Sequence, residues 1–143
     1  MDPMSSTNKI LFSSSTKNLA MVRSFIEAKA HAFGFDESTI IQIILSVDEA
    51  CTNIIKHAHK YNEEEQIEVE TKAETKQFKV ILKYKGQGFD PNELDNPDML
   101  DYFNKFKIGG LGVPIMKKFM SNIEFVHKNS DYNCLTLTKS LVS

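Results

Sequence analysis

Two polar side chains in the segment "DEACTN", residues 48–53, have the types and the spacing of a catalytic pair. Glu49 and Asn53 are four positions apart, so in a helix they lie one above the other on the same face. A carboxylate near an attacking hydroxyl can act as a general base, and a neutral amide oxygen one turn away can bind Mg²⁺ without neutralising that base. A solvated helix surface is the alternative interpretation of the pair.

Two glycine-rich turns have the composition of loops that approach a nucleotide. The first, "GQG" at Gly86 and Gly88, directly follows a stretch of alternating residues, and glycine permits positive φ and close approach of a ligand. The second begins a helix, where free amide groups and the positive end of the helix dipole favour phosphate. It consists of Gly109, Gly110, Leu111 and Gly112. The alternative for the first segment is an ordinary loop turn. The alternative for the second is a flexible joint between a loop and the helix.

Hydrophobic periodicity predicts the elements that position these residues. A strand over 9–14 is followed by two amphipathic helices, the first capped at Ser15 or Thr16 and the second at Asp36. Gly34 ends the first helix, and the second runs to about His59. The second helix therefore carries both Glu49 and Asn53.

The rest of the chain is predicted to form two pairs of strands with one helix between the pairs. Alternating residues predict strands at 66–71, 77–84, 122–127 and 134–139, with a helix beginning near 112. The loop at 90–108 is too long for an ordinary connection. This order predicts an α+β fold, a two-layer sandwich with helices on one face of a mainly antiparallel or mixed sheet.

Composition limits the classes of partner. The 143 residues suit one domain over 1–143, with 1–8 expected to be flexible. A net charge of −2 shows no basic excess, so neither nucleic acid nor an anionic membrane is the expected partner. No apolar run approaches a membrane span, and Cys51 and Cys134 read as core residues of a reducing compartment. A cytoplasmic protein is the simplest interpretation.

Three segments occur in the order "DEACTN", "GQGFDP" and "GGLGVPIMKKFM". With these segments the chain resembles the anti-sigma-factor serine kinases of bacteria, which belong to the ATPase superfamily shared by gyrase and sensor histidine kinases. The resemblance extends from about residue 9 to residue 139. It implies the histidine kinase-like, Bergerat-type fold, with ATP as substrate and Mg²⁺ as cofactor. It also implies that Glu49 is the catalytic base, that Asn53 binds Mg²⁺, and that Gly86 and Gly88 shape the adenine side of the pocket. Residues 109–112 then wrap the phosphates under a lid formed by 90–108.

Tyr84 departs from the pattern of the family. Members of the superfamily usually have an aspartate two residues before the first glycine of this turn, where it accepts a hydrogen bond from the adenine amino group. Alternation places Tyr84 on the face of the sheet that the helices cover. Its phenol can accept that hydrogen bond, its ring can stack on the base, or the ring can fill the pocket.

The resemblance predicts an ATP-dependent protein-serine kinase that also acts as an anti-sigma factor. Its partners are then a sigma factor and an antagonist protein that it phosphorylates on serine, and related proteins often work as dimers. The alternative is a binding module without catalysis, motivated by Tyr84. The ATP-binding part of a sensor histidine kinase is a third candidate, but the chain leaves no room for a dimerisation helix pair.

Other charged side chains receive less specific interpretations. Arg23 is expected to be exposed, and the resemblance implies that an arginine on this helix faces the protein partner. Lys56 and Lys60 are expected on a solvated face. His57 and His59 lie near the end of the second helix, and their rings diverge too much for a metal site. The acidic residues Asp95, Asp98 and Asp101 are expected to keep the lid soluble.

Overall fold

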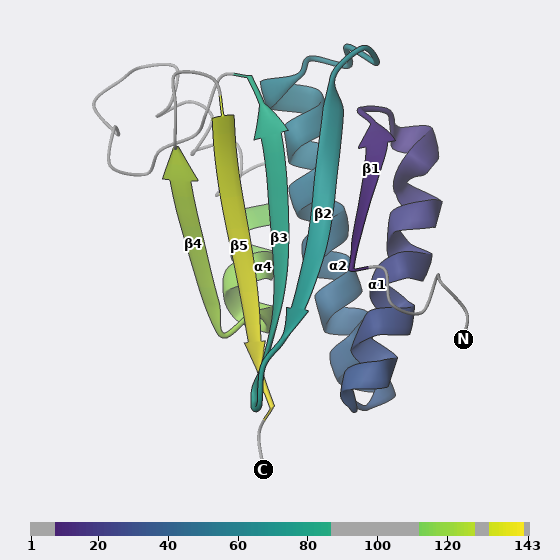
Figure 1. Ribbon diagram of the computed structural model, residues 1–143. Helices are drawn as coiled ribbons and strands as arrows, with labels where there is room; N and C mark the ends of the chain where they lie inside the picture. The colour runs from purple at the N-terminus through teal and green to yellow at the C-terminus, as the bar shows by residue number, and fades with distance from the viewer. Residues whose placement is uncertain (1–7, 87–111, 128–131, 142–143) are drawn as a thin grey trace.

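One face of a single five-stranded sheet is covered by the helices in the computed structural model, which describes residues 8–86, 112–127 and 132–141 (Figure 1). The strands are β1 (Lys9–Ser13), β2 (Gln66–Ala73), β3 (Gln77–Lys85), β4 (Asn122–His127) and β5 (Tyr132–Ser140). They lie in the order β1-β2-β3-β5-β4, and every neighbouring pair is antiparallel. The predicted two-layer α+β architecture is confirmed, with an antiparallel sheet.

The second helix begins at its predicted cap, but two other predicted helix bounds are corrected: Ser15 caps a 3₁₀ turn and not the first helix itself, and the second α-helix changes to a π-helical turn after Asn53. The helices are α1 (Leu19–Phe33), α2 (Glu37–Asn53) and α4 (Gly112–Phe119), with a 3₁₀ turn, Thr16–Asn18, before α1 and a π-helical turn, η3 (Ile54–Ala58), after α2. Asp36 caps α2, because its Oδ1 accepts a hydrogen bond of 2.8 Å from the backbone N–H of Thr39. Hydrogen bonds from Thr39, first from its side chain and second from its backbone N–H, lower the pKa of Asp36. Gly34 ends α1 with φ of 110°.

Gly34 allows a stability prediction that depends on the backbone alone. A Cβ at this position would meet no atom within 4 Å, so Gly34→Ala adds no clash and only forces a side-chain-bearing residue into positive φ. We expect a loss of about 1–2 kcal/mol, visible as a thermal midpoint several degrees lower. Gly34→Asn should lose less, because asparagine adopts positive φ more readily. Equal midpoints for wild type and the alanine variant would contradict this account.

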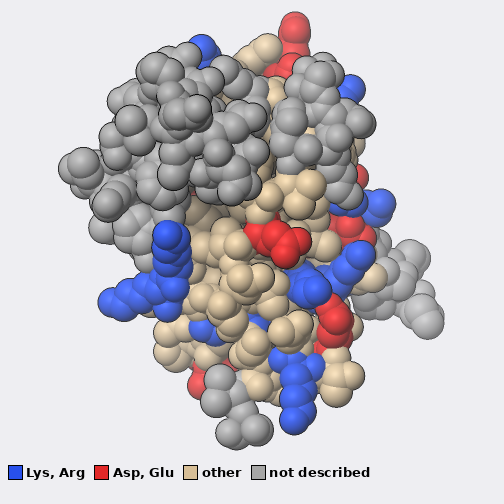
Figure 2. All heavy atoms as spheres, turned by 90° about the vertical axis from the view of Figure 1, so that its left-hand side faces the viewer, with Lys and Arg blue, Asp and Glu red and all other residues tan. Residues whose placement is uncertain are grey.

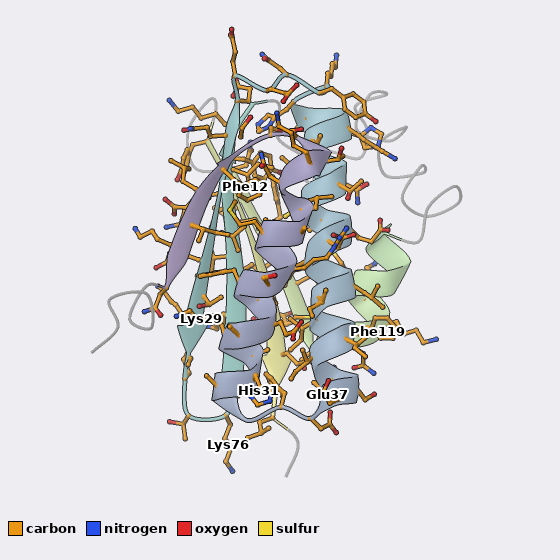
Figure 3. All side chains as sticks on the ribbon, turned by 90° about the vertical axis from the view of Figure 1, so that its right-hand side faces the viewer. Phe12, Lys29, His31, Glu37, Lys76 and Phe119 are labelled. Atoms are coloured by element: carbon orange, nitrogen blue, oxygen red, sulfur yellow. The ribbon has the colours of Figure 1, made fainter. Side chains whose placement is uncertain are left out.

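The core lies between the inner face of the sheet and the apolar stripes of the helices. Its fully buried members include Val22, Ile26, Ile43, Val47, Ile67, Val69, Phe78, Val80, Leu82 and Leu137. Phe12 joins this core from β1, on the helix side of the sheet (Figure 3). The opposite face carries ion pairs such as Lys83 with Glu70 at 3.3 Å. Burial of one sheet face and hydration of the other produce the alternation seen in β2 and β3.

Helix α2 is the central helix of the helical layer, and it packs against both α1 and α4. The stretch Glu37–Ala58 is long and apolar enough to cross a membrane by length and composition, but half of it is buried inside the fold. Its apolarity is therefore that of a core helix. Cys51 on α2 and Cys134 on β5 are both buried with free thiols, as predicted, and burial raises the pKa of the Cys51 thiol.

Charged side chains of both signs are interspersed on the face shown in Figure 2. The lysines of α4, Lys117 and Lys118, are both exposed. This mixture agrees with the net charge of −2.

Candidate functional site

Glu49 occupies the last full turn of α2 and is half-buried. Its pKa is raised, first by burial and second by the negative charge of Asp48, while Lys56 opposes the shift. A raised pKa makes the carboxylate a stronger base than an exposed glutamate. The environment of Glu49 is therefore suited to taking a proton from a hydroxyl group.

Asn53 lies one turn further along and has an unsatisfied side chain. Its Nδ2 is buried, and within the part of the chain that the structure describes this amide nitrogen has no hydrogen-bond partner. A buried polar group without a partner costs about 1–3 kcal/mol, so this amide is a candidate for contact with a bound ligand. Rotation by 180° exchanges the amide oxygen and nitrogen at little cost in shape. The side chain thus fits a site that binds either Mg²⁺ through its oxygen or a phosphate oxygen through its nitrogen.

The C-terminal end of α2 meets the end of β3, and both lie at the top of the molecule in Figure 1. Gly86, directly after β3, has φ of 119°. A Cβ on Gly86 would lie 3.3 Å from Cδ2 of His59 and 3.4 Å from the carbonyl oxygen of Ala58. Only glycine suits this position, and the first glycine-rich turn is thereby brought against the helix that carries Glu49 and Asn53.

Tyr84 points into the core, as the alternation predicts. Its side chain is only 4% exposed and belongs to the main hydrophobic cluster. Its ring lies edge-on to His59, with ring centroids 6.0 Å apart. Burial raises the pKa of Tyr84, so the phenol stays neutral and keeps both a donor and acceptor lone pairs.

His59 is the residue of this region whose importance the sequence did not reveal. It is 5% exposed, and it contacts both the turn at Gly86 and the ring of Tyr84. One available signal was its position four residues after Ile55 and eight after Cys51, which continues the apolar stripe of α2. Lys56 and Lys60, by contrast, are exposed as predicted.

Arg23 connects α1 to the segment of α2 that carries Glu49. Its Nε lies 2.8 Å from Oδ1 of Asp48, and its side chain remains 48% exposed. The guanidinium is therefore both paired and accessible. Contact with a protein partner stays a prediction for Arg23.

Several predicted site residues lie outside the described residues. These are Gly88, Gly109, Gly110, Leu111 and the acidic residues of the 90–108 segment. Gly112 is the first residue of α4, and α4 packs against α2. Gly112, the last residue of the second glycine-rich segment, therefore begins a helix, as predicted, and that helix packs beside the one that carries Glu49.

Comparison with known proteins decides the family. A family model described as "Histidine kinase-like ATPase domain" matches residues 12–139. The chain belongs to this family. The match runs from β1 to β5 and includes Glu49, Asn53 and both glycine-rich segments.

Curated relatives of this histidine kinase-like ATPase chain are bacterial serine-protein kinases at low identity. The serine-protein kinase RsbW of Listeria monocytogenes is 29% identical over 98 residues, which are 66% of this chain and 62% of that protein. The RsbW of Bacillus subtilis is 24% identical over 110 residues, covering 73% of this chain and 68% of that protein. The RsbW of Bacillus pumilus is 28% identical over 130 residues, covering 86% and 78% respectively. The chain therefore spans less than two thirds of the Listeria protein and more of the others.

Proposed function

We propose that this chain is an ATP-dependent protein-serine kinase that binds a sigma factor and phosphorylates an antagonist protein on serine. The observation that carries the proposal is the arrangement at the end of α2. There, the basic carboxylate of Glu49 and the unsatisfied amide of Asn53 share a helix whose end contacts the Gly86 turn. The family and the serine-protein kinase relatives support the same activity.

The proposed reaction transfers the γ-phosphoryl group of ATP to a serine hydroxyl of the antagonist. Glu49 accepts the hydroxyl proton while the serine oxygen forms a bond to the γ-phosphorus. The bond between that phosphorus and the β,γ-bridging oxygen breaks, and ADP leaves. Asn53 would hold Mg²⁺, which neutralises charge on the phosphates when bound. The product serine carries about −1.5 to −2 charges, which weakens the contact with this chain.

The proposal has a direct test. The purified chain is incubated with γ-labelled ATP, Mg²⁺ and the soluble proteins of its source cell, and labelled proteins are identified by mass spectrometry. We expect one small protein labelled on serine and binding to the chain only before labelling. Label found on a histidine of the chain itself would instead support the sensor-kinase interpretation.

Tyr84 motivates the second candidate, a binding module without nucleotide control, because its ring occupies the core where the family usually has an aspartate. We propose instead that its neutral hydroxyl accepts the hydrogen bond from the adenine amino group. Neutral hydrogen bonds contribute about 0.5–1.5 kcal/mol, so Tyr84→Phe should weaken ATP binding about two- to tenfold.

Titration with a fluorescent ATP analogue measures this change. GTP has no amino group at that position of the base, so its affinity should be the same in wild type and Tyr84→Phe. Equal ATP affinity in both proteins would exclude the hydroxyl as the adenine contact and leave stacking. No binding to either protein would favour the binding module.

A further inference from the structure

The carbonyl groups of three consecutive residues at the end of β3 accept hydrogen bonds from two buried side chains. His59 Nε2 lies 2.6 Å from the carbonyl oxygen of Lys85. Asn133 Nδ2 lies 3.4 Å from the carbonyl oxygen of Tyr84 and 3.1 Å from that of Gly86. His59 is 5% exposed and Asn133 is fully buried. The backbone that leads into the first glycine-rich turn is therefore held from the helical layer and from β5 at once.

The hydrogen bonds define the tautomer of His59. A carbonyl oxygen only accepts, so Nε2 must carry a hydrogen and donate it to Lys85. Nδ1, 2.8 Å from Oγ of Ser14, then accepts the hydroxyl hydrogen of that fully buried serine. Glu65 Oε2 lies 3.9 Å from Nε2, beyond hydrogen-bonding distance. His59 thus links the residue after β1, the end of the α2 helix and the end of β3.

This link sets the distance between the two halves of the candidate site. Glu49 and Asn53 lie on α2, and His59 follows the π-helical turn that extends α2. Gly86 directly follows β3 of the sheet, and Lys85, the last residue of β3, lies 26 residues after His59. Ligand sites require groups held to within about 0.5 Å, and a short, partly buried hydrogen bond from the buried His59 ring to the backbone of Lys85 supplies that restraint.

We propose that His59 is a positioning residue, which holds the Gly86 turn at the distance from α2 that a nucleotide requires. The part of this inference that concerns nucleotide binding rests on the proposed function. The restraint of the turn by His59 is independent of that function, since it follows from the described contacts.

A matched pair of variants separates positioning from mere stability. In His59→Gln the amide nitrogen reaches the place of Nε2, so the bond to Lys85 can form while that to Ser14 is lost. In His59→Asn the shorter amide reaches only the place of Nδ1, so the bond to Ser14 can form while that to Lys85 is lost. Each variant loses one hydrogen bond, and we expect similar thermal midpoints without nucleotide.

The affinity for Mg²⁺-ATP should differ between the two variants. Titration of a fluorescent ATP analogue should give His59→Gln an affinity within about threefold of wild type. His59→Asn should bind about tenfold more weakly, because the partly buried bond that holds the Gly86 turn is lost. If wild type binds ATP and both variants bind it equally, the positioning role is overturned while the proposed function stands.

A measurement without nucleotide distinguishes the remaining outcomes. Long-range ¹H–¹⁵N correlation spectra of the wild type in alkaline buffer report which ring nitrogen of His59 carries the hydrogen. We expect the Nε2–H tautomer. The Nδ1–H tautomer would overturn the inference whatever the nucleotide result, since that ring cannot donate to Lys85. With the Nε2–H tautomer and no ATP binding by wild type, the proposed function and the nucleotide role of His59 both fail.

Discussion

Glu49→Gln should abolish phosphoryl transfer to the antagonist and leave nucleotide binding intact. Glutamine has the shape of glutamate but cannot accept the serine proton, and general base catalysis contributes about 10²–10⁴-fold in rate. The half-buried position of Glu49 makes an isosteric change the mildest one available there. Serine phosphorylation at saturating Mg²⁺-ATP measures the rate, and the thermal shift caused by nucleotide measures binding.

Glu27→Gln is a matched control, because Glu27 is an exposed carboxylate on α1 and should keep the wild-type rate. The pH profile gives a second readout. A general base must be deprotonated, so the rate falls as pH falls through its pKa, and the raised pKa of Glu49 places this loss at higher pH than for an ordinary glutamate. Full-rate transfer by Glu49→Gln would remove Glu49 from the mechanism.

Asn53→Ala should lose the stabilisation by nucleotide while keeping the stability of the free protein. A ligand at 100 times its dissociation constant adds about 2.7 kcal/mol to the free energy of unfolding, which raises the thermal midpoint of wild type by several degrees. In the variant the proposed Mg²⁺ ligand is absent, so we expect little or no shift with Mg²⁺-ATP or Mg²⁺-ADP.

The free protein supplies the control for this variant. Because Nδ2 of Asn53 has no partner among the described residues, its removal breaks no hydrogen bond there, and the midpoint without nucleotide should stay close to that of wild type. Chelation of Mg²⁺ should reduce the shift of wild type and leave the variant unchanged. A wild type that does not respond to millimolar nucleotide would favour the binding module, and an equal shift in both proteins would exclude Asn53 as a ligand.

Contacts between sequence neighbours made the elements of this fold predictable. Asp36 caps α2 through an N–H three residues away, and Gly34 ends α1 through its own backbone freedom. The outward charges and inward apolar residues of β2 and β3 follow the period of two that an antiparallel sheet with one wet face requires. The inward direction of Tyr84 was predictable for the same reason.

The sequence by itself determined that Glu49 and Asn53 share one face of α2, since they are related by one helical turn. It also determined the order of strands and helices along the chain, because the spacing of hydrophobic residues differs between strands and helices. Only the tertiary structure decided what surrounds those side chains. The burial that raises the pKa of Glu49 and the missing partner of Asn53 depend on packing between elements. The contacts of His59 with Ser14 and Lys85 join residues 45 and 26 positions apart, and no local pattern encodes a hydrogen bond over such a separation.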